Sequence, residues 1–137
     1  MTPKANVDII WNYVEKIWNK GDISALEELT TSDFTFAIGS EPERNRAVMA
    51  QFVKMIRSAF PDWYVRMVDT ITDNNVTVAR WKGNATHNGS FYGIEATGKQ
   101  IVISGINIYR LEGDKIKKEW EQMDTLGLLR QLGVLPG

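Results

Sequence analysis

The spacing of apolar residues changes once along this chain, near Trp63. Before Trp63, apolar side chains recur every three or four positions, which places them on one face of a helix. The first such set is Val7, Ile10, Trp11, Val14, Ile17 and Trp18. After Trp63, polar and apolar residues alternate, which is typical of strands. Helices followed by a run of long strands indicate an α+β domain, with the helices packed on one face of a curved antiparallel sheet.

The helical part of the chain contains three segments with this spacing. The first spans residues 3–20 and is followed by Gly21, a residue that suits a helix end. A second, short helix is expected after Asp22, and a third over about 45–59. Residues 33–38 lie between the last two and form either a loop or a short strand.

The second part of the chain is punctuated by two turn sequences, Asp73-Asn74-Asn75 and Glu112-Gly113-Asp114. Residues 89–98 form a loop or a short extra strand, and the glycines at its two ends are consistent with a hinge. A strongly bent sheet under helices encloses a cone with a pocket at its centre. Residues 1–137 are expected to form this one domain. The expected strands are 63–72, 76–87, 99–111 and 115–124, with a terminal helix at 126–132.

The composition excludes several classes of function. The chain has 137 residues, with 16 Lys and Arg against 17 Asp and Glu, so a basic surface for nucleic acid is not expected. It has no cysteine and one histidine, which removes disulfides, thiolate nucleophiles and multi-histidine metal sites. No apolar run is long enough to span a membrane and no signal peptide is visible, so we expect a cytoplasmic protein. The remaining chemistry depends on Asp, Glu, His, Tyr, Trp and amide side chains.

Strict alternation along residues 115–124 predicts which side chains face the pocket. It places Trp120, Gln122 and Asp124 inside, and Glu119 and Glu121 on the opposite face, toward solvent or an interface. An aspartate that faces a core must find a partner or change its pKa, which makes Asp124 a candidate acid/base. Asp124 also precedes the terminal helix and is equally suited to cap it.

The same alternation on residues 76–87 places Trp81 and His87 inside. His87 is either a pocket residue or a histidine near a loop, bonded to a backbone carbonyl. On residues 99–111, Asn107 and Tyr109 share one face, and alternation alone does not decide which face is inside. Tryptophans at such positions are more often core than ligand-binding, and Tyr92 could be a surface or a lid residue. The candidates for substrate binding are Trp81, Trp120, Gln122, Tyr92, Asn107 and Phe36.

Six short strings occur in a recognisable order between about Asp8 and Gly133. Together they resemble the SnoaL-like polyketide (ester) cyclase family, within the NTF2-like superfamily. The strings are Phe60-Pro61-Asp62-Trp63, Thr86-His87-Asn88-Gly89, Tyr92-Gly93 leading to Thr97-Gly98-Lys99, Gly105-Ile106-Asn107-Ile108-Tyr109-Arg110, Glu119-Trp120 with Asp124, and Gln131-Leu132-Gly133.

The resemblance implies an NTF2-like cone that assembles through its sheet as a homodimer or homotetramer. It implies a small-molecule ligand in the cone, and a cofactor-free enzyme of the cyclase, isomerase or lyase type without a metal. The characterised relatives close a ring by an intramolecular aldol reaction. In that reading Asp124 matches the family's acid/base and His87 its pocket histidine, a donor that would stabilise an enolate. The expected substrate is a small, largely apolar carbonyl compound.

The sequence also departs from the family pattern. Residues 34–38 carry no histidine, and Ala85 stands where some cyclases have a polar amide. Both departures leave a more apolar site with fewer donors. An alternative function is therefore a non-catalytic module that binds a small molecule or supports dimerisation. Isomerisation of a ketosteroid-like compound is a further alternative, in which Tyr109 or Tyr13 would be the donor.

Overall fold

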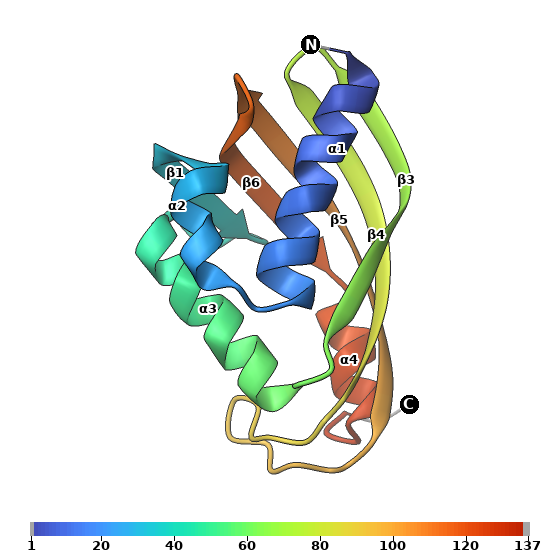
Figure 1. Cartoon of the computed structure of the whole chain (residues 1–137). Helices are drawn as coiled ribbons and strands as arrows, with labels where there is room; N and C mark the ends of the chain where they lie inside the picture. Colours follow the sequence, from blue (N-terminus) through green and yellow to red (C-terminus); the bar gives the residue numbers. More distant parts are fainter. Residues whose placement is uncertain (1, 136–137) are drawn as a thin grey trace.

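The computed structural model describes residues 2–135, so the predicted domain limits at 1 and 137 lie outside the described residues. Helices come first and strands follow, as the change in spacing predicts (Figure 1). The elements are α1 (Pro3–Tyr13), a π-helical turn (Val14–Asn19), a 3-10 turn (Ile23–Ala25), α2 (Leu26–Leu29), β1 (Thr30–Ile38), β2 (Arg44–Asn45), α3 (Arg46–Ala59), β3 (Tyr64–Asp73), β4 (Val76–Thr86), β5 (Gln100–Glu112), β6 (Lys115–Met123) and α4 (Thr125–Gln131).

The strands form one curved sheet in the order β2-β1-β6-β5-β4-β3. β3 to β6 are antiparallel neighbours, but β1 runs parallel to β6. The sheet is therefore mixed, and the prediction of a purely antiparallel sheet is wrong at this one pair. The exception arises at β1, the strand between α2 and α3, which is longer than expected. It lies beside β6, the last strand of the chain.

Both α1 and α3 pack on the concave face of the sheet, and Figure 1 shows α1 in front of the strands. α1 contributes Ile10 and Tyr13 to the core, and α3 contributes Met49 and Val53, all at most 1% exposed. The buried set on the sheet alternates as predicted along β4, where Ala79, Trp81 and Ala85 point inward. This confirms the α+β cone with helices on one face of a curved sheet.

The first residues of β5 have no partner on β6, and α4 covers this part of the strand. Pairing with β6 stops at Gly105, which lies opposite Met123. Gln131 of α4 then takes the place of a strand residue, because its amide accepts from Val102 N at 2.8 Å and donates to Val102 O at 2.8 Å. The backbone groups that β6 leaves free at Val102 are thereby paired.

The loop between β4 and β5 docks on the end of α3. Asn88 N and Gly89 N both donate to Ala59 O at 3.0 Å. Phe91 is 3% exposed and packs on Phe60, with ring centroids 5.3 Å apart. The loop contains a single isolated bridge, between Phe91 and Ile94, so it is a loop and not an extra strand.

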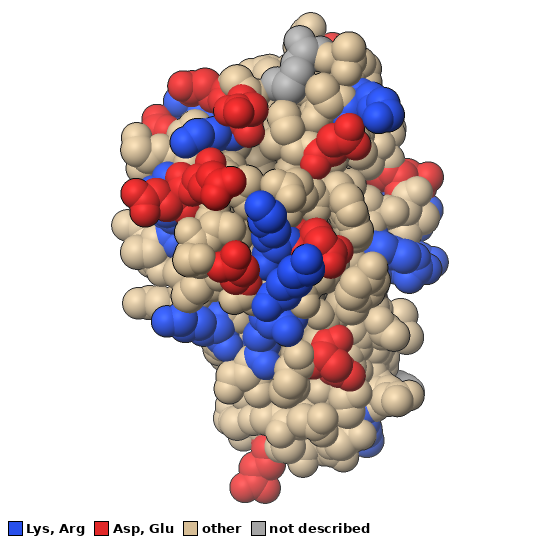
Figure 2. Space-filling view, in the orientation of Figure 1, with Lys and Arg blue, Asp and Glu red and all other residues tan. Residues whose placement is uncertain are grey.

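No helix among residues 2–135 has the length and apolar character needed to cross a bilayer. Figure 2 shows that Lys and Arg side chains lie among Asp and Glu side chains on the face it displays, so neither sign of charge dominates that face.

Candidate active site

A cavity with about 500 Å³ of space unfilled by atoms, part of it continuous with solvent, lies between the helices and the concave face of the sheet. Most of its wall is apolar, and aromatic side chains are prominent in it. A few polar groups from β5 and β6 converge at one side. The lining residues are Val14, Trp18, Phe52, Ile56, Trp63, Val65, Met67, Ala79, Trp81, Asn107, Tyr109, Glu121 and Met123.

The helical wall of the cavity is not a regular α-helix. The helix predicted over residues 3–20 is α-helical only to Tyr13 and continues as a π-helical turn over Val14–Asn19. In this turn Lys20 N donates to Glu15 O at 3.0 Å, five residues earlier. Val14 and Trp18, both in this wider turn, line the cavity. Such turns occur often at functional sites, because they displace side chains from the regular helical positions.

The orientation of the Asn107 amide follows from its contact with Trp81. The indole N–H of Trp81 can only donate, so the atom that it meets at 2.9 Å is Asn107 Oδ1. Asn107 Nδ2 is thereby directed toward Glu119 Oε2, at 3.0 Å, and the Tyr109 hydroxyl, at 3.3 Å. Asn107 therefore donates to two groups that are both near the cavity.

Glu119 is a buried carboxyl behind the cavity wall. Its side chain is 2% exposed, and Tyr13 donates to Glu119 Oε1 at 2.7 Å while Asn107 donates to Oε2. Burial and the neighbouring Glu121 carboxyl raise the pKa of Glu119 to about 8, although the two hydrogen bonds oppose this rise. Glu119 is thus held in one position by two donors.

Glu121 is the carboxyl that borders the cavity itself. It is two residues after Glu119, on the same face of β6, and it lies opposite Asn107 on β5. Burial raises the pKa of Glu121 to about 7, and the Asn107 side chain opposes the rise. A carboxyl with a pKa near neutrality can both remove and return a proton at physiological pH.

Tyr109 provides a hydroxyl at the same place. Its ring is 3% exposed and lines the cavity. Burial, together with Glu119 and Glu121, raises the pKa of the Tyr109 phenol well above its ordinary value, so the hydroxyl keeps its proton. Because Asn107 donates to the Tyr109 oxygen, the Tyr109 proton is free to be donated elsewhere.

A β-bulge in β6 decides which residues of this strand face inward. Ile116 pairs with Leu111 and Lys118 with Arg110, so Lys117 is an extra residue without a partner on β5. Beyond the bulge the alternation is reversed, which turns Glu119 and Glu121 inward. The prediction that Trp120 and Gln122 face the cavity is wrong for this reason, since strict alternation assumes a strand without an extra residue.

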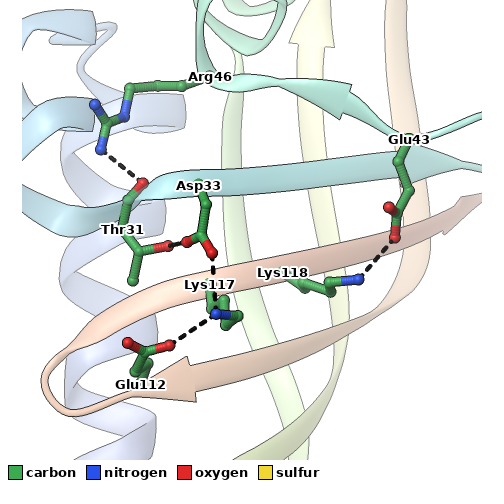
Figure 3. Close-up of polar contacts among 7 residues, drawn as sticks. All are labelled: Thr31, Asp33, Glu43, Arg46, Glu112, Lys117 and Lys118. Carbon is green, nitrogen blue, oxygen red and sulfur yellow. Dashed lines mark hydrogen bonds and ion pairs between the residues drawn. The ribbon is translucent and has the colours of Figure 1, made fainter.

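Ion pairs hold the bulged residue on the outside of the sheet (Figure 3). Lys117 Nζ lies 3.1 Å from Asp33 Oδ2 on β1 and 2.9 Å from Glu112 Oε2 at the end of β5. The next residue, Lys118, pairs with Glu43 at 3.2 Å. Successive lysines thus point to different partners, which is consistent with the irregular backbone between them.

The predicted inward residues of β6 and the residue after it lie elsewhere. Asp124 is exposed, and its Oδ1 accepts from Gly127 N at 2.9 Å, so the capping alternative describes its contacts. Trp120 lies on the outer face of the sheet with Lys118 Nζ 6.0 Å from its ring centroid, and Gln122 is exposed. The structure does not bring Asp124 to the cavity.

His87 is fully buried, as its inward face predicts, but it does not line the cavity. Thr97 N donates to His87 Nδ1 at 3.2 Å, so the ring proton lies on Nε2. Among residues 2–135, no group forms a hydrogen bond with this Nε2. The ring packs on Phe60, with centroids 5.4 Å apart. His87 therefore joins the loop to the core.

The remaining candidates divide between wall and surface. Trp81 and Asn107 line the cavity, as predicted. Phe36 is buried one layer behind it and stacks on the lining residue Phe52, with centroids 6.1 Å apart. Tyr92 is 73% exposed at the tip of the loop.

Glu119 and Glu121 were missed because the segment Lys115–Glu121 has charged residues on both of its faces. Only Ile116 and Trp120 are apolar there, and the bulge between them places them on opposite faces. Within residues 2–135, no three His, Asp or Glu side chains are grouped in a way that could hold a metal ion.

Comparison with known proteins identifies related folds. A family model described as SnoaL-like polyketide cyclase matches residues 9–132. AclR from Streptomyces galilaeus, named as a proposed hydroxylase, is 23% identical over 99% of this chain and 85% of its own, with a TM-score of 0.89. TsrD from Streptomyces laurentii is 24% identical over 98% and 99%, with a TM-score of 0.86. A proposed polyketide cyclase from Acidithiobacillus ferrooxidans is 27% identical over 97% and 98%, with a TM-score of 0.84. No curated protein matches the chain.

Proposed function

The chain belongs to the SnoaL-like polyketide cyclase family, and we propose that it is an enzyme that acts on a small, largely apolar carbonyl compound by acid/base chemistry, without a cofactor. The observation that carries this proposal is the position of Glu121, a carboxyl with a raised pKa on the wall of an apolar cavity. Such a group is a stronger base than an exposed carboxylate and works near neutral pH.

In the proposed reaction, Glu121 removes a proton from the carbon next to the substrate carbonyl. The electron pair of the broken C–H bond forms an enolate, and the Tyr109 hydroxyl donates a hydrogen bond to the enolate oxygen. Asn107 holds the Tyr109 hydroxyl, and Glu119 holds Asn107. The aromatic wall, including Trp81, orients the substrate and excludes water.

The family and the proposed cyclase among its relatives favour ring closure as the next step. The enolate carbon attacks a second carbonyl carbon of the same molecule and forms a C–C bond. The resulting alkoxide takes the proton back from Glu121, so the enzyme returns to its starting state. Return of the proton to a different carbon would instead give an isomerisation, with the same residues in the same roles.

Asp124, which the resemblance matched to the family's acid/base, and His87, which it matched to the pocket histidine, are given no chemical role in this proposal. Asp124 is exposed and caps α4, and His87 is bonded to the loop outside the cavity lining. Glu121 takes the role of the base and Tyr109 that of the donor.

The test uses 2-tetralone, a bicyclic ketone whose protons next to the carbonyl are acidic. We expect the wild-type protein to accelerate exchange of these protons for deuterium, followed by NMR in D2O. Glu121→Gln should reduce the acceleration at least about a hundredfold, the lower range for a positioned base. Asp124→Asn is the matched control and should exchange at the wild-type rate. Equal rates in wild type and Glu121→Gln would reject the proposal.

A second candidate function is a binding module without catalysis. It is favoured by the polar groups beside the cavity, which are largely bonded to one another: Trp81 to Asn107, Asn107 to Glu119 and Tyr13 to Glu119. In that case 2-tetralone would bind, and the wild-type protein would exchange its protons no faster than buffer.

We also propose that two copies associate through the outer face of the sheet. The side chains of Val102, Ile106 and Ile108 of β5 are 63%, 48% and 39% exposed there. A second copy would remove this apolar surface from water. Analytical ultracentrifugation should show a homodimer or homotetramer for the wild type and a monomer for Ile106→Asp. A monomeric wild type would exclude this association.

A further inference from the structure

A groove with about 490 Å³ of unfilled space, open to solvent, runs between α1 and β3. Val7 and Trp11 of α1 form one side of it, and both are partly exposed. Residues 67–70 form the other side, which is the free edge of the sheet because β3 is the outermost strand. Neither the sequence motifs nor the proposed chemistry assigns a role to this groove.

The groove and the cavity are bordered by the same two elements. Val7 and Trp11 line the groove, and Val14 and Trp18, one and two turns further along the same helical segment, line the cavity. On the strand, Val65 lines the cavity and residues 68–70 line the groove. The two spaces therefore follow one another along the same helical face and the same strand.

Met67 is the residue that the two spaces share. Its side chain is partly exposed, and a methionine has three rotatable bonds, so it can move aside at low cost. Next to it, the pairing of β3 with β4 is interrupted between Met67 and Asp69, which leaves Val68 as an extra residue. At this bulge Val68 is 39% exposed and lines the groove.

We propose that the ligand of the cavity is elongated, and that an apolar arm of it passes Met67 and lies in the groove against Trp11 and Val68. This inference rests on the proposed function, since it takes the carbonyl end of the ligand to lie at Glu121. The arm is an alkyl or aryl group, because Val7, Trp11, Met67 and Val68 present carbon to it. Asp69 and Thr70 form a polar rim at which the arm can end in water.

The test measures affinity against arm length. The probes are 4-alkylcyclohexanones from methyl to octyl, titrated calorimetrically into the protein at pH 7.5. Each methylene buried in the groove is expected to strengthen binding about fourfold. For the wild type we expect affinity to rise across the series. Val68→Asp should bind the methyl compound as the wild type does, and the octyl compound at least about tenfold more weakly.

Leu126→Asp is the matched control, since it places the same charge at an exposed apolar position that lines neither space. It should reproduce the wild-type series. Trp11→Ala removes the opposite wall and should shorten the range of rising affinity in the same way, which provides a second variant if Val68→Asp does not fold by circular dichroism.

Two outcomes would overturn the inference, and they are distinguishable. If the wild-type affinity stops rising with length, or if Val68→Asp weakens methyl and octyl probes equally, the groove is not part of the site, while proton exchange of 2-tetralone through Glu121 still stands. If no probe binds and 2-tetralone is not exchanged, both the groove inference and the proposed function are wrong.

Discussion

The Tyr13 hydroxyl donates to Glu119 Oε1 at 2.7 Å, across a separation of 106 residues in the chain. Both groups are buried, Tyr13 at 0% and Glu119 at 2% exposure. This bond joins the first helix to the last strand at the polar side of the cavity. Glu119 also accepts a hydrogen bond from Asn107, and Asn107 donates to the Tyr109 hydroxyl. The Tyr13–Glu119 bond therefore connects α1 to Tyr109 through these hydrogen bonds.

Tyr13→Phe removes this donor and leaves Glu119 with Asn107 alone. A buried carboxylate that loses a donor costs about 1–3 kcal/mol, so we expect the free energy of unfolding to fall by that amount at pH 8. The loss should be smaller at pH 5.5, where Glu119 is protonated. Urea unfolding at both pH values measures it, with the exposed Tyr64→Phe as control. A loss that is equal at the two pH values would argue against an ionised Glu119.

Stability is expected to fall as pH rises from about 5 toward 8. The ordinary pKa of a glutamate is 4.5, and in the folded protein it is raised to about 8 for Glu119 and about 7 for Glu121. Between these limits the folded state binds more protons than the unfolded state, so unfolding becomes easier as protons are lost. The free energy of unfolding should fall by on the order of 1 kcal/mol per pH unit over this interval.

The measurement is the urea midpoint at intervals between pH 5 and pH 8. The variant that carries both Glu119→Gln and Glu121→Gln should have a flat profile over this interval, because the amides do not titrate. A slope that persists in this variant would assign the pH dependence to other groups.

Gly105→Ala should disturb the cavity wall. Gly105 lies opposite Trp81, and a Cβ there would be 2.5 Å from Trp81 Cζ2 and 2.7 Å from Gln122 O. Because a backbone oxygen cannot move freely, we expect a loss of about 1–3 kcal/mol in stability and a changed Trp81 environment. Urea unfolding and tryptophan fluorescence report the two effects, and Ser104→Ala is the neighbouring control. An unchanged fluorescence spectrum and urea midpoint would show that Trp81 does not pack closely against Gly105.

Asp124→Ala should lower stability by about 1 kcal/mol, since the Asp124 side chain caps α4 through Gly127 N. Asp124→Asn should have nearly wild-type stability because asparagine caps helices equally well. Both variants are expected to exchange 2-tetralone at the wild-type rate. A variant that kept its stability but lost exchange would restore Asp124 as the acid/base.

Much of the fold could be read from local patterns. The spacing of Ile10, Val14 and Ile17 predicts a helical face, and alternation on β4 predicts that Trp81 and His87 point inward; the structure confirms both. These predictions held because each depends on one regular element, whose period alone decides which side chains share a face. The parallel pairing of β1 with β6 involves segments far apart in the chain, and no local pattern encodes it.

The candidate site depended on two irregularities that local periods do not contain. The extra residue Lys117 reverses the alternation of β6, and the π-helical turn after Tyr13 changes the helical wall. Lys117 makes ion pairs with Asp33 and Glu112, which come from two other parts of the chain. Each irregularity shifts side chains by one residue, which in a strand is enough to exchange the two faces.

The sequence by itself determined the order of helices and strands, the apolar faces that join them and the family to which the chain belongs. Only the tertiary structure decided that Glu121 and not Asp124 borders the cavity, and that Asn107 and Tyr109 face it. The physical reason is that a carboxyl acquires its chemistry from its surroundings. Burial raises the pKa of Glu121, whereas Asp124, exposed at a helix end, caps α4.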